Sequence, residues 1–433
     1  MLEAELEGKL PEVENYEDVL TSNVFGTIKY LPFEEGLLQI LSEAVNHGTD
    51  DNFLTYFRSK YNLDISEYMI GEILFWPSIE DYGEPDLVII LKSKGNENPN
   101  FILGIEVKYQ SHKSGSGEER DQLKRYFESL QNKRSSYNDF EGEFLGIIYL
   151  TSYNAKKEIE ESISYIEKSH HDDEEVREKF FRMRWKNLTS LFKEIESENP
   201  FSKKIYTDIY RLLDKKNLKE FEGIPFPKEI PEEIFLDINS DIKYFGGDNL
   251  VENKKGEEIS KVFDYMIEFY KTVSNLYQDI DDLMAEEGWE PTTNSNAIVK
   301  KTSNSMKNPH KWLARHTTRK YKNEDKLGKI RVVLTYLKWG SKVDEPTIVL
   351  IRIDDFKKGE EDGFWPNKFW QSQDEPTPGY EEWISGYYRN DEDVKSGLEN
   401  ENFKYHYEYK TMPLRDIKNK EVIKENIVNE LLD

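Results

Sequence analysis

The chain contains 433 residues, lacks cysteine and carries a formal net charge of −26. Without cysteine it has no disulfide, no thiolate zinc site and no cysteine nucleophile. A hydrophobic content of 37%, with 13% aromatic residues, supports real cores and argues against global disorder. No apolar run approaches the roughly 20 residues that span a bilayer, and the acidic N-terminus lacks a signal-like apolar core, so we expect a cytoplasmic protein with no membrane partner.

Residues 1–150 predict an α/β unit, because apolar runs of strand length alternate with segments of helical periodicity. The second and third predicted strands are joined by a polar segment with turn chemistry and therefore form a hairpin. The expected order is a helix, three strands, a helix and a further strand, over residues 32–46, 71–76, 87–91, 101–105, 118–127 and 144–150.

Three ionisable residues gather at one end of this hairpin. Asp86 opens its first strand, and Glu106 and Lys108 close its second. Side chains alternate along a strand, so Glu106 and Lys108 point to the same face. The two carboxylates repel each other unless a cation lies between them, and Mg²⁺ prefers oxygen ligands, which would include the carbonyl of Val107. Such a cluster can activate water against a phosphodiester, with Lys108 orienting the water or stabilising charge on the phosphate.

A polar pair follows the hairpin. Residues 114–117 read Ser-Gly-Ser-Gly and form a flexible break before a helix with acids in its first turn. Gln122 and Tyr126 are four residues apart and share one face of this helix. Taken alone, Gln122 reads as an exposed helix residue.

Together these features resemble the PD-(D/E)XK nuclease superfamily. A Pro-Asp pair ends at Asp86, and a Glu-Val-Lys motif begins 20 residues later at Glu106. The resemblance covers roughly residues 20–150 and implies a restriction-endonuclease-like core, a mixed sheet flanked by helices. It also implies that Asp86 and Glu106 bind the metal and that Lys108 assists the attacking water. Members often carry a Gln and an aromatic residue at the places of Gln122 and Tyr126, so the resemblance makes Gln122 a candidate for positioning the water or the phosphate.

Members of this superfamily often add a third acid from the first core helix. The sequence does not choose among the candidates, and each alone reads equally as a solvated surface acid. They are Glu34, Glu35, Glu43 and, on the first strand, Glu72.

The middle of the chain predicts mostly helix, at residues 156–168, 173–198 and 206–218. A stretch rich in Pro, Gly and Asp near 228–255 marks a domain boundary. The expected parts are a nuclease-like domain with a helical extension, a connector helix and a C-terminal α+β recognition or regulatory domain, over residues 1–240, 241–290 and 291–433.

The connector is expected as a long helix over residues 257–287. Its apolar residues recur at alternating spacings of three and four, a heptad pattern over more than three repeats. Additional aromatic residues broaden the stripe, which favours burial in a bundle; self-association or a partner helix is the alternative. The heptad positions are Ile259, Val262, Met266, Phe269, Val273, Leu276, Ile280 and Leu283.

Cations are concentrated in residues 300–331, which hold eleven Lys and Arg residues and two acids. The phosphate backbone of nucleic acid would repel so acidic a chain. The cations of residues 300–331, here called the basic island, can bind that backbone. Lys311, Arg315 and Arg319 recur at four-residue spacing and would line one helix face in contact with phosphates. A basic helix that docks on an acidic protein surface is the alternative.

The C-terminal part predicts paired strands at 330–337 and 347–353 and a last helix at 416–432. Aromatic-rich segments at 363–370 and 380–388 suit a small core or a binding surface.

These features indicate a metal-dependent endonuclease that hydrolyses phosphodiester bonds, with DNA as the expected substrate and Mg²⁺, replaceable by Mn²⁺, as cofactor. A nuclease domain joined to a second domain is typical, by analogy, of bacterial restriction or anti-phage systems. We expect a homo-oligomer or a partner subunit, because an unregulated nuclease endangers its host. The alternatives are a non-catalytic subunit with a nuclease fold and a DNA-binding assembly factor.

Overall fold

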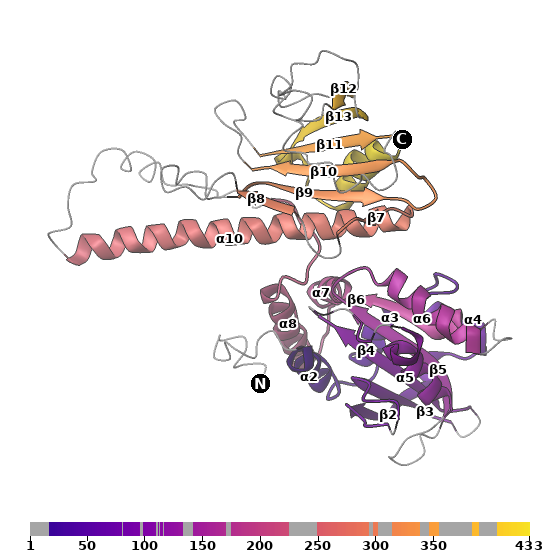
Figure 1. Ribbon diagram of the computed structural model, residues 1–433. Coiled ribbons are helices and arrows are strands. Elements are labelled where there is room, and N and C mark those ends of the chain that lie inside the picture. The colour runs from indigo at the N-terminus through magenta and orange to yellow at the C-terminus, as the bar shows by residue number, and fades with distance from the viewer. Residues whose placement is uncertain are drawn as a thin grey trace. The chain divides into compact units, whose positions relative to one another are not determined.

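The chain forms two compact units, Met1–Glu220 and Phe221–Asp433, each built on its own sheet (Figure 1). The predicted boundary region near 228–255 lies largely outside the residues that the computed structural model describes. The described residues are 17–79, 81–95, 98–109, 111, 113–115, 117–132, 142–169, 175–224, 249–293, 298–301, 314–337, 346–354, 383–388 and 405–433.

The first unit contains a mixed six-stranded sheet in the order β1-β6-β5-β4-β3-β2. Strands β2, β3 and β4 are antiparallel, β4, β5 and β6 are parallel, and β1 runs antiparallel to β6. All four strands predicted in this part are confirmed. The bounds are β1 Val45–Asn46, β2 Tyr68–Phe75, β3 Leu87–Ser93, β4 Phe101–Lys108, β5 Glu143–Thr151 and β6 Phe180–Arg184.

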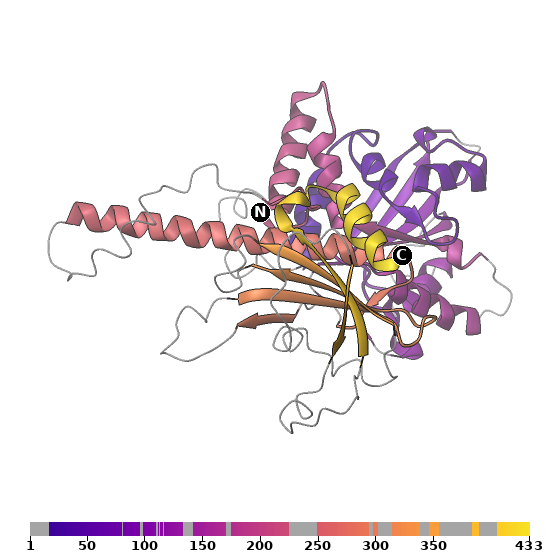
Figure 2. The same ribbon diagram turned by 90° about the horizontal axis from the view of Figure 1, so that it is seen from above.

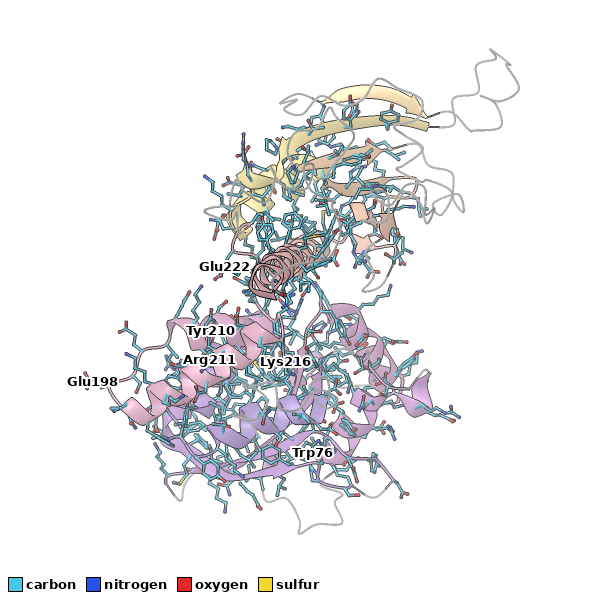
Figure 3. The ribbon with its side chains drawn as sticks, turned by 90° about the vertical axis from the view of Figure 1, so that its left-hand side faces the viewer. Trp76, Glu198, Tyr210, Arg211, Lys216 and Glu222 are labelled. Carbon is cyan, nitrogen blue, oxygen red and sulfur yellow. The ribbon has the colours of Figure 1, made fainter. Side chains whose placement is uncertain are left out.

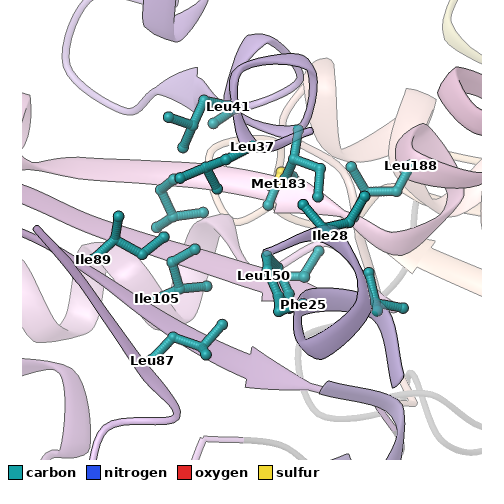
Figure 4. Packing of buried hydrophobic residues seen from close by; sticks show 14 of the residues in the cluster. Phe25, Ile28, Leu37, Leu41, Leu87, Ile89, Ile105, Leu150, Met183 and Leu188 are labelled. Atoms are coloured by element: carbon teal, nitrogen blue, oxygen red, sulfur yellow. The ribbon is translucent and has the colours of Figure 1, made fainter. Parts of the chain in front are cut away.

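Helices cover both faces of this sheet. One core cluster joins α2, α3, α4, α7 and α8 to one face, and a second joins α5 and α6 to the other; Figure 4 shows side chains of the first cluster. The split follows strand alternation, since Leu103, Ile105 and Val107 of β4 face the first cluster and Ile102 faces the second. The bounds are α2 Glu17–Ile28, α3 Leu37–Ser42, α4 Phe53–Tyr61, α5 Gln122–Gln131, α6 Lys156–Ser169, α7 Trp185–Glu194 and α8 Pro200–Lys215.

Two predicted helices of the first unit are corrected. The helix expected at 32–46 is only α3, because the preceding residues form turns and Val45 enters β1. The helix expected at 173–198 contains β6, and only Trp185–Glu194 is helical. Parallel pairing of β6 with β5 overrides helical periodicity there, and aromatic residues suit a half-buried strand.

The second unit contains an antiparallel sheet in the order β12-β13-β11-β10-β9-β7, with β8 paired to β9. The predicted pairing of strands at 330–337 and 347–353 is confirmed as β10 with β11. The bounds are β7 Glu290–Pro291, β8 Ile298–Lys301, β9 Ala314–Lys322, β10 Ile330–Tyr336, β11 Thr347–Ile353, β12 Ile384–Tyr388 and β13 Tyr405–Pro413.

The long helix α10, Asn249–Glu286, packs on this sheet rather than in a helical bundle. Val273, Leu276 and Ile280 of its heptad are buried against strands β10 and β11 and against the C-terminal helical segment. That segment runs from Lys420 to Leu432 through α13, a π-helical turn and α14. The last helix, predicted at 416–432, therefore begins about one turn later than predicted. The N-terminal turns of α10 extend beyond the sheet in both views (Figures 1 and 2). No described helix is long and apolar enough to cross a membrane.

The prediction that Lys311, Arg315 and Arg319 line one face of a helix is wrong. Residues 314–322 form β9, which pairs with β10 along seven residues, and the β-branched pair Thr317 and Thr318 suits a strand. The Arg319 side chain is 3% exposed and contacts Asp281 of α10 through Nε at 2.9 Å and Nη2 at 2.6 Å. Lys311 lies outside the described residues, as does the side chain of Arg315.

Replacing Arg319 with Met should destabilise the second unit by about 3 kcal/mol, because Asp281 would lose its cation in a mostly buried setting. Denaturant unfolding followed by circular dichroism measures this. Lys322→Met removes the same charge from an exposed position of β9 and should change stability by no more than about 0.5 kcal/mol. The double variant Asp281→Leu with Arg319→Met should recover part of the loss, because the buried Tyr321 hydroxyl also loses its acceptor Asp281; a double variant less stable than Arg319→Met alone would contradict a structural ion pair.

Candidate active site

The register of β3 and β4 brings two acids together. Leu87 pairs with Ile105, so the preceding Asp86 stands opposite Glu106 on the neighbouring strand. An Asp86 carboxylate oxygen accepts a hydrogen bond from the Val107 N–H at 2.7 Å, which ties it to the end of β4. The Asp86 carbonyl accepts from the N–H of Trp76 at 3.0 Å. Trp76, labelled in Figure 3, adopts a left-handed φ of 46° to make this bond.

Lys108 completes the cluster. Its Nζ donates to Glu106 Oε1 at 2.7 Å, as expected for two side chains on the same face of a strand. Asp86 is 7% exposed, Glu106 1% and Lys108 4%. Charged residues are almost never buried to this degree unless they are paired, so the structure gathers the three predicted residues Asp86, Glu106 and Lys108 into one buried ionic cluster.

The acid that reaches this cluster from a helix is Glu17, in the first turn of α2. Its Oε1 accepts from Lys108 Nζ at 3.1 Å, and its Oε2 accepts from the N–H of Tyr109 at 2.8 Å and from Ser111 Oγ at 2.9 Å. Sequence reasoning missed Glu17. An acid just before an apolar run does signal a helix start, but the contact spans 91 residues.

The four candidates for a third acid make no such contact in the described residues. Glu34 pairs with Lys94 at 2.8 Å, and the Glu35 carboxylate accepts from Ser197 at 3.4 Å. Glu43 is half-buried and its pKa is raised by burial. Glu72 is exposed on β2.

The electrostatics of the cluster favour an added cation. Burial and the charge of Asp86 raise the pKa of Glu106 well above its ordinary value, against the opposing effect of Lys108. Burial likewise raises the pKa of Asp86, although the Val107 N–H opposes it. Lys108 stays protonated, because its carboxylate neighbours outweigh its burial and raise its pKa. Neutralising one of these acids, by a proton or by a cation, would relieve the cost of burying their charges together.

Gln122 and Tyr126 form a second polar layer on α5. The Gln122 Nε2 donates to the Tyr126 hydroxyl at 3.1 Å, which donates in turn to the carbonyl of Glu84 at 2.9 Å. Burial and the negative charge of Glu106 raise the pKa of Tyr126 to about 12. The predicted shared face is confirmed, and through Glu84 the pair supports the chain segment that carries Asp86.

Lys113 anchors the loop between β4 and α5. Its ammonium contacts Asp121 Oδ2 at 2.5 Å and Ser162 Oγ at 2.9 Å. Asp121 is also the N-cap of α5 and accepts from the Lys124 N–H at 2.8 Å. This network, absent from the sequence reasoning, sets where α5 begins and hence where Gln122 lies.

The residues present fit a divalent cation. Within the described part of the chain, no group of three or more His, Cys, Asp or Glu lies ready to hold a metal ion. However, Glu106 Oε2 is buried and accepts no hydrogen bond from a donor group of the described residues, although a proton shared with the Asp86 carboxyl would pair the two acids. Asp86 and Glu106 would supply two oxygen ligands, and the role of the Val107 carbonyl stays a prediction.

Comparison of the chain with protein-family models, with curated proteins and with solved structures finds no match.

The raised pKa of Glu106 makes a prediction about stability without metal. Because the folded-state pKa exceeds the ordinary value of 4.5, the native state binds this proton more tightly than the unfolded chain does. The contribution of Glu106 to stability therefore declines as the pH rises from 4.5 toward the raised pKa. In EDTA, Glu106→Gln should gain stability relative to wild type as the pH rises from 4.5 to about 8.

Urea unfolding at several pH values measures this difference. Glu72→Gln, an exposed acid of β2, is the matched control and should track wild type at every pH. A difference between Glu106→Gln and wild type that does not change with pH would contradict the raised pKa.

Proposed function

We propose that the first unit is a magnesium-dependent nuclease with a restriction-endonuclease-like core. The observation that carries this proposal is the buried cluster of Asp86, Glu106 and Lys108 at the paired ends of β3 and β4. A purely structural ion pair needs one acid for one lysine. Here two acids face each other across adjacent strands, and both have raised pKa values.

Each residue has a role that its contacts support. Mg²⁺, or Mn²⁺ as a substitute, would be held by Asp86 and Glu106. The Val107 N–H orients Asp86, and Glu106 Oε2 accepts no hydrogen bond from a described donor group. The bound metal would lower the pKa of a water molecule and offset charge on the phosphate. Lys108 remains protonated and would orient the attacking water or stabilise the developing negative charge. Gln122 would orient the same water or the phosphate from α5.

The proposed reaction is endonucleolytic hydrolysis of phosphodiester bonds, with DNA as substrate, by a cytoplasmic protein of a bacterial restriction or anti-phage system. The net charge of −26 makes unaided DNA binding unfavourable. We therefore propose that the cations that bind DNA come from the second unit, from a second copy of the chain or from a partner subunit. Arg319 is committed to Asp281, which leaves Lys311 and Arg315 as the candidate phosphate contacts.

Asp86→Asn, Glu106→Gln and Lys108→Ala should each reduce magnesium-dependent cleavage of plasmid DNA by at least about 100-fold, because each removes a group from the reacting centre. A gel assay with metal added or chelated measures this loss. Lys92→Ala, at an exposed position near the other end of β3, should cleave as wild type does.

The same assay separates the alternatives. Full cleavage by a folded Lys108→Ala protein would reject the site assignment. DNA binding that survives EDTA, with no cleavage under any metal, would support a DNA-binding assembly factor or a non-catalytic subunit.

The basic island gives a separate prediction. Charge reversal at Lys311 and Arg315 should weaken DNA affinity several-fold at low salt and flatten its salt dependence, because fewer counterions are released. Filter binding in EDTA at several salt concentrations measures both quantities. Unchanged affinity would exclude Lys311 and Arg315 from the interface, and Lys261→Glu, at an exposed position of α10 outside the island, serves as the charge control.

A further inference from the structure

A set of hydrogen-bond donors converges beside the buried cluster. Lys108 Nζ, the Tyr109 N–H and Ser111 Oγ all point at one carboxylate, that of Glu17, over distances of 2.8 to 3.1 Å. Both carboxylate oxygens are engaged, one by the ammonium and the other by the two remaining donors. Such a convergence of a cation, a backbone amide and a hydroxyl is typical of oxyanion binding sites.

Two of the three donors are held in place by groups other than Glu17. The Tyr109 carbonyl accepts a hydrogen bond from Ser152 Oγ, which fixes the peptide at the end of β4. The Lys216 ammonium, at the C-terminal end of α8 (Figure 3), lies 5.5 Å from the centre of the Tyr109 ring. Lys108 is held by Glu106 at 2.7 Å. The Tyr109 amide and the Lys108 ammonium would therefore keep their positions if the Glu17 carboxylate left, and the exposed Ser111 hydroxyl could turn to a new acceptor.

Glu17 is more exposed than the lysine that it contacts. Its side chain is 22% exposed, whereas that of Lys108 is 5% exposed. Glu17 stands in the first turn of α2, so rotation of its side chain could carry the carboxylate toward solvent.

Charge makes Glu17 and a phosphodiester competitors for Lys108. Glu17 is an acid that accepts a hydrogen bond from Lys108 Nζ beside two further acids, Asp86 and Glu106. A phosphodiester, which is also an anion with two acceptor oxygens on one centre, cannot approach Lys108 while Glu17 is there. Departure of Glu17 opens the donors and removes one repelling charge.

We propose that Lys108 Nζ, the Tyr109 N–H and Ser111 Oγ form an oxyanion subsite for a substrate phosphate, which the Glu17 carboxylate occupies when no substrate is bound. Glu17 is then an internal competitor that keeps the site closed to weakly bound nucleic acid. The inference builds on the proposed nuclease function, yet it concerns anion binding without metal and is tested without catalysis.

The test measures binding of a thymidine dinucleotide, which has a single phosphodiester, to the full chain in EDTA. The readout is the Tyr109 amide resonance in protein labelled with ¹⁵N-tyrosine, assigned with Tyr109→Phe. Glu17→Ala should tighten binding by at least about tenfold, because the competitor is gone, and the Tyr109 amide should shift on titration. Adding Ser111→Ala should reverse part of that gain.

Asp18→Ala is the matched control, since it removes an exposed acid from the same helical turn and should bind as wild type does. If Glu17→Ala does not fold, Glu17→Asp shortens the side chain by one methylene and should tighten binding in the same direction. Unchanged dinucleotide affinity, or a Tyr109 amide that does not shift, would overturn the proposal. Weaker Mg²⁺ binding by Glu17→Ala with unchanged dinucleotide affinity would also overturn it, making Glu17 a metal ligand.

A failure of the nuclease proposal gives a different result. In that case the dinucleotide would still bind more tightly to Glu17→Ala in EDTA, but no metal would produce cleavage in the wild type.

Discussion

The antiparallel register of β3 with β4 is the constraint on which the candidate site depends. It sets Asp86 opposite Glu106 at the end of a hairpin covered by helices on both faces. A shift by one residue would turn Glu106 and Lys108 into the apolar layer of Ile105 and Val107. The hydrogen bond from the Val107 N–H to Asp86 belongs to the same register, so the alignment of apolar side chains also positions the acids.

Burying two acids in contact creates a need for positive charge. Lys108 meets part of it but is shared between Glu106 and Glu17, and Glu106 keeps one oxygen without a donor among the described residues. The cluster therefore contains three acids and one lysine, and we propose that a cation supplies the missing positive charge. The contrast with Arg319 and Asp281 is direct, because there the guanidinium contacts both oxygens of its single acid and the pair is complete by itself.

Elements that depend on residues close together in the sequence were predicted correctly, and elements that depend on distant residues were not. Strands β2 to β5 and helices α5, α6 and α10 were predictable, because apolar periodicity and capping are local. The same reasoning expected helix at β6 and β9, where charged and apolar residues mimic a helical pattern. Both strands exist through pairing with distant partners, β5 and β10, which no local pattern contains. The predicted phosphate-binding face including Arg319 failed for this reason.

The chemistry of the hairpin can be read from the sequence alone, because Asp86 precedes one apolar strand, Glu106 and Lys108 end the next, and alternation puts the last two on one face. Only the tertiary structure decided that Glu17, rather than any of the four predicted acids, reaches Lys108, and that Tyr109 and Ser111 join it there. It also decided that Arg319 is buried on a strand. The reason is physical: alternation is a property of one strand, whereas contacts across 91 residues depend on how helices pack on the finished sheet.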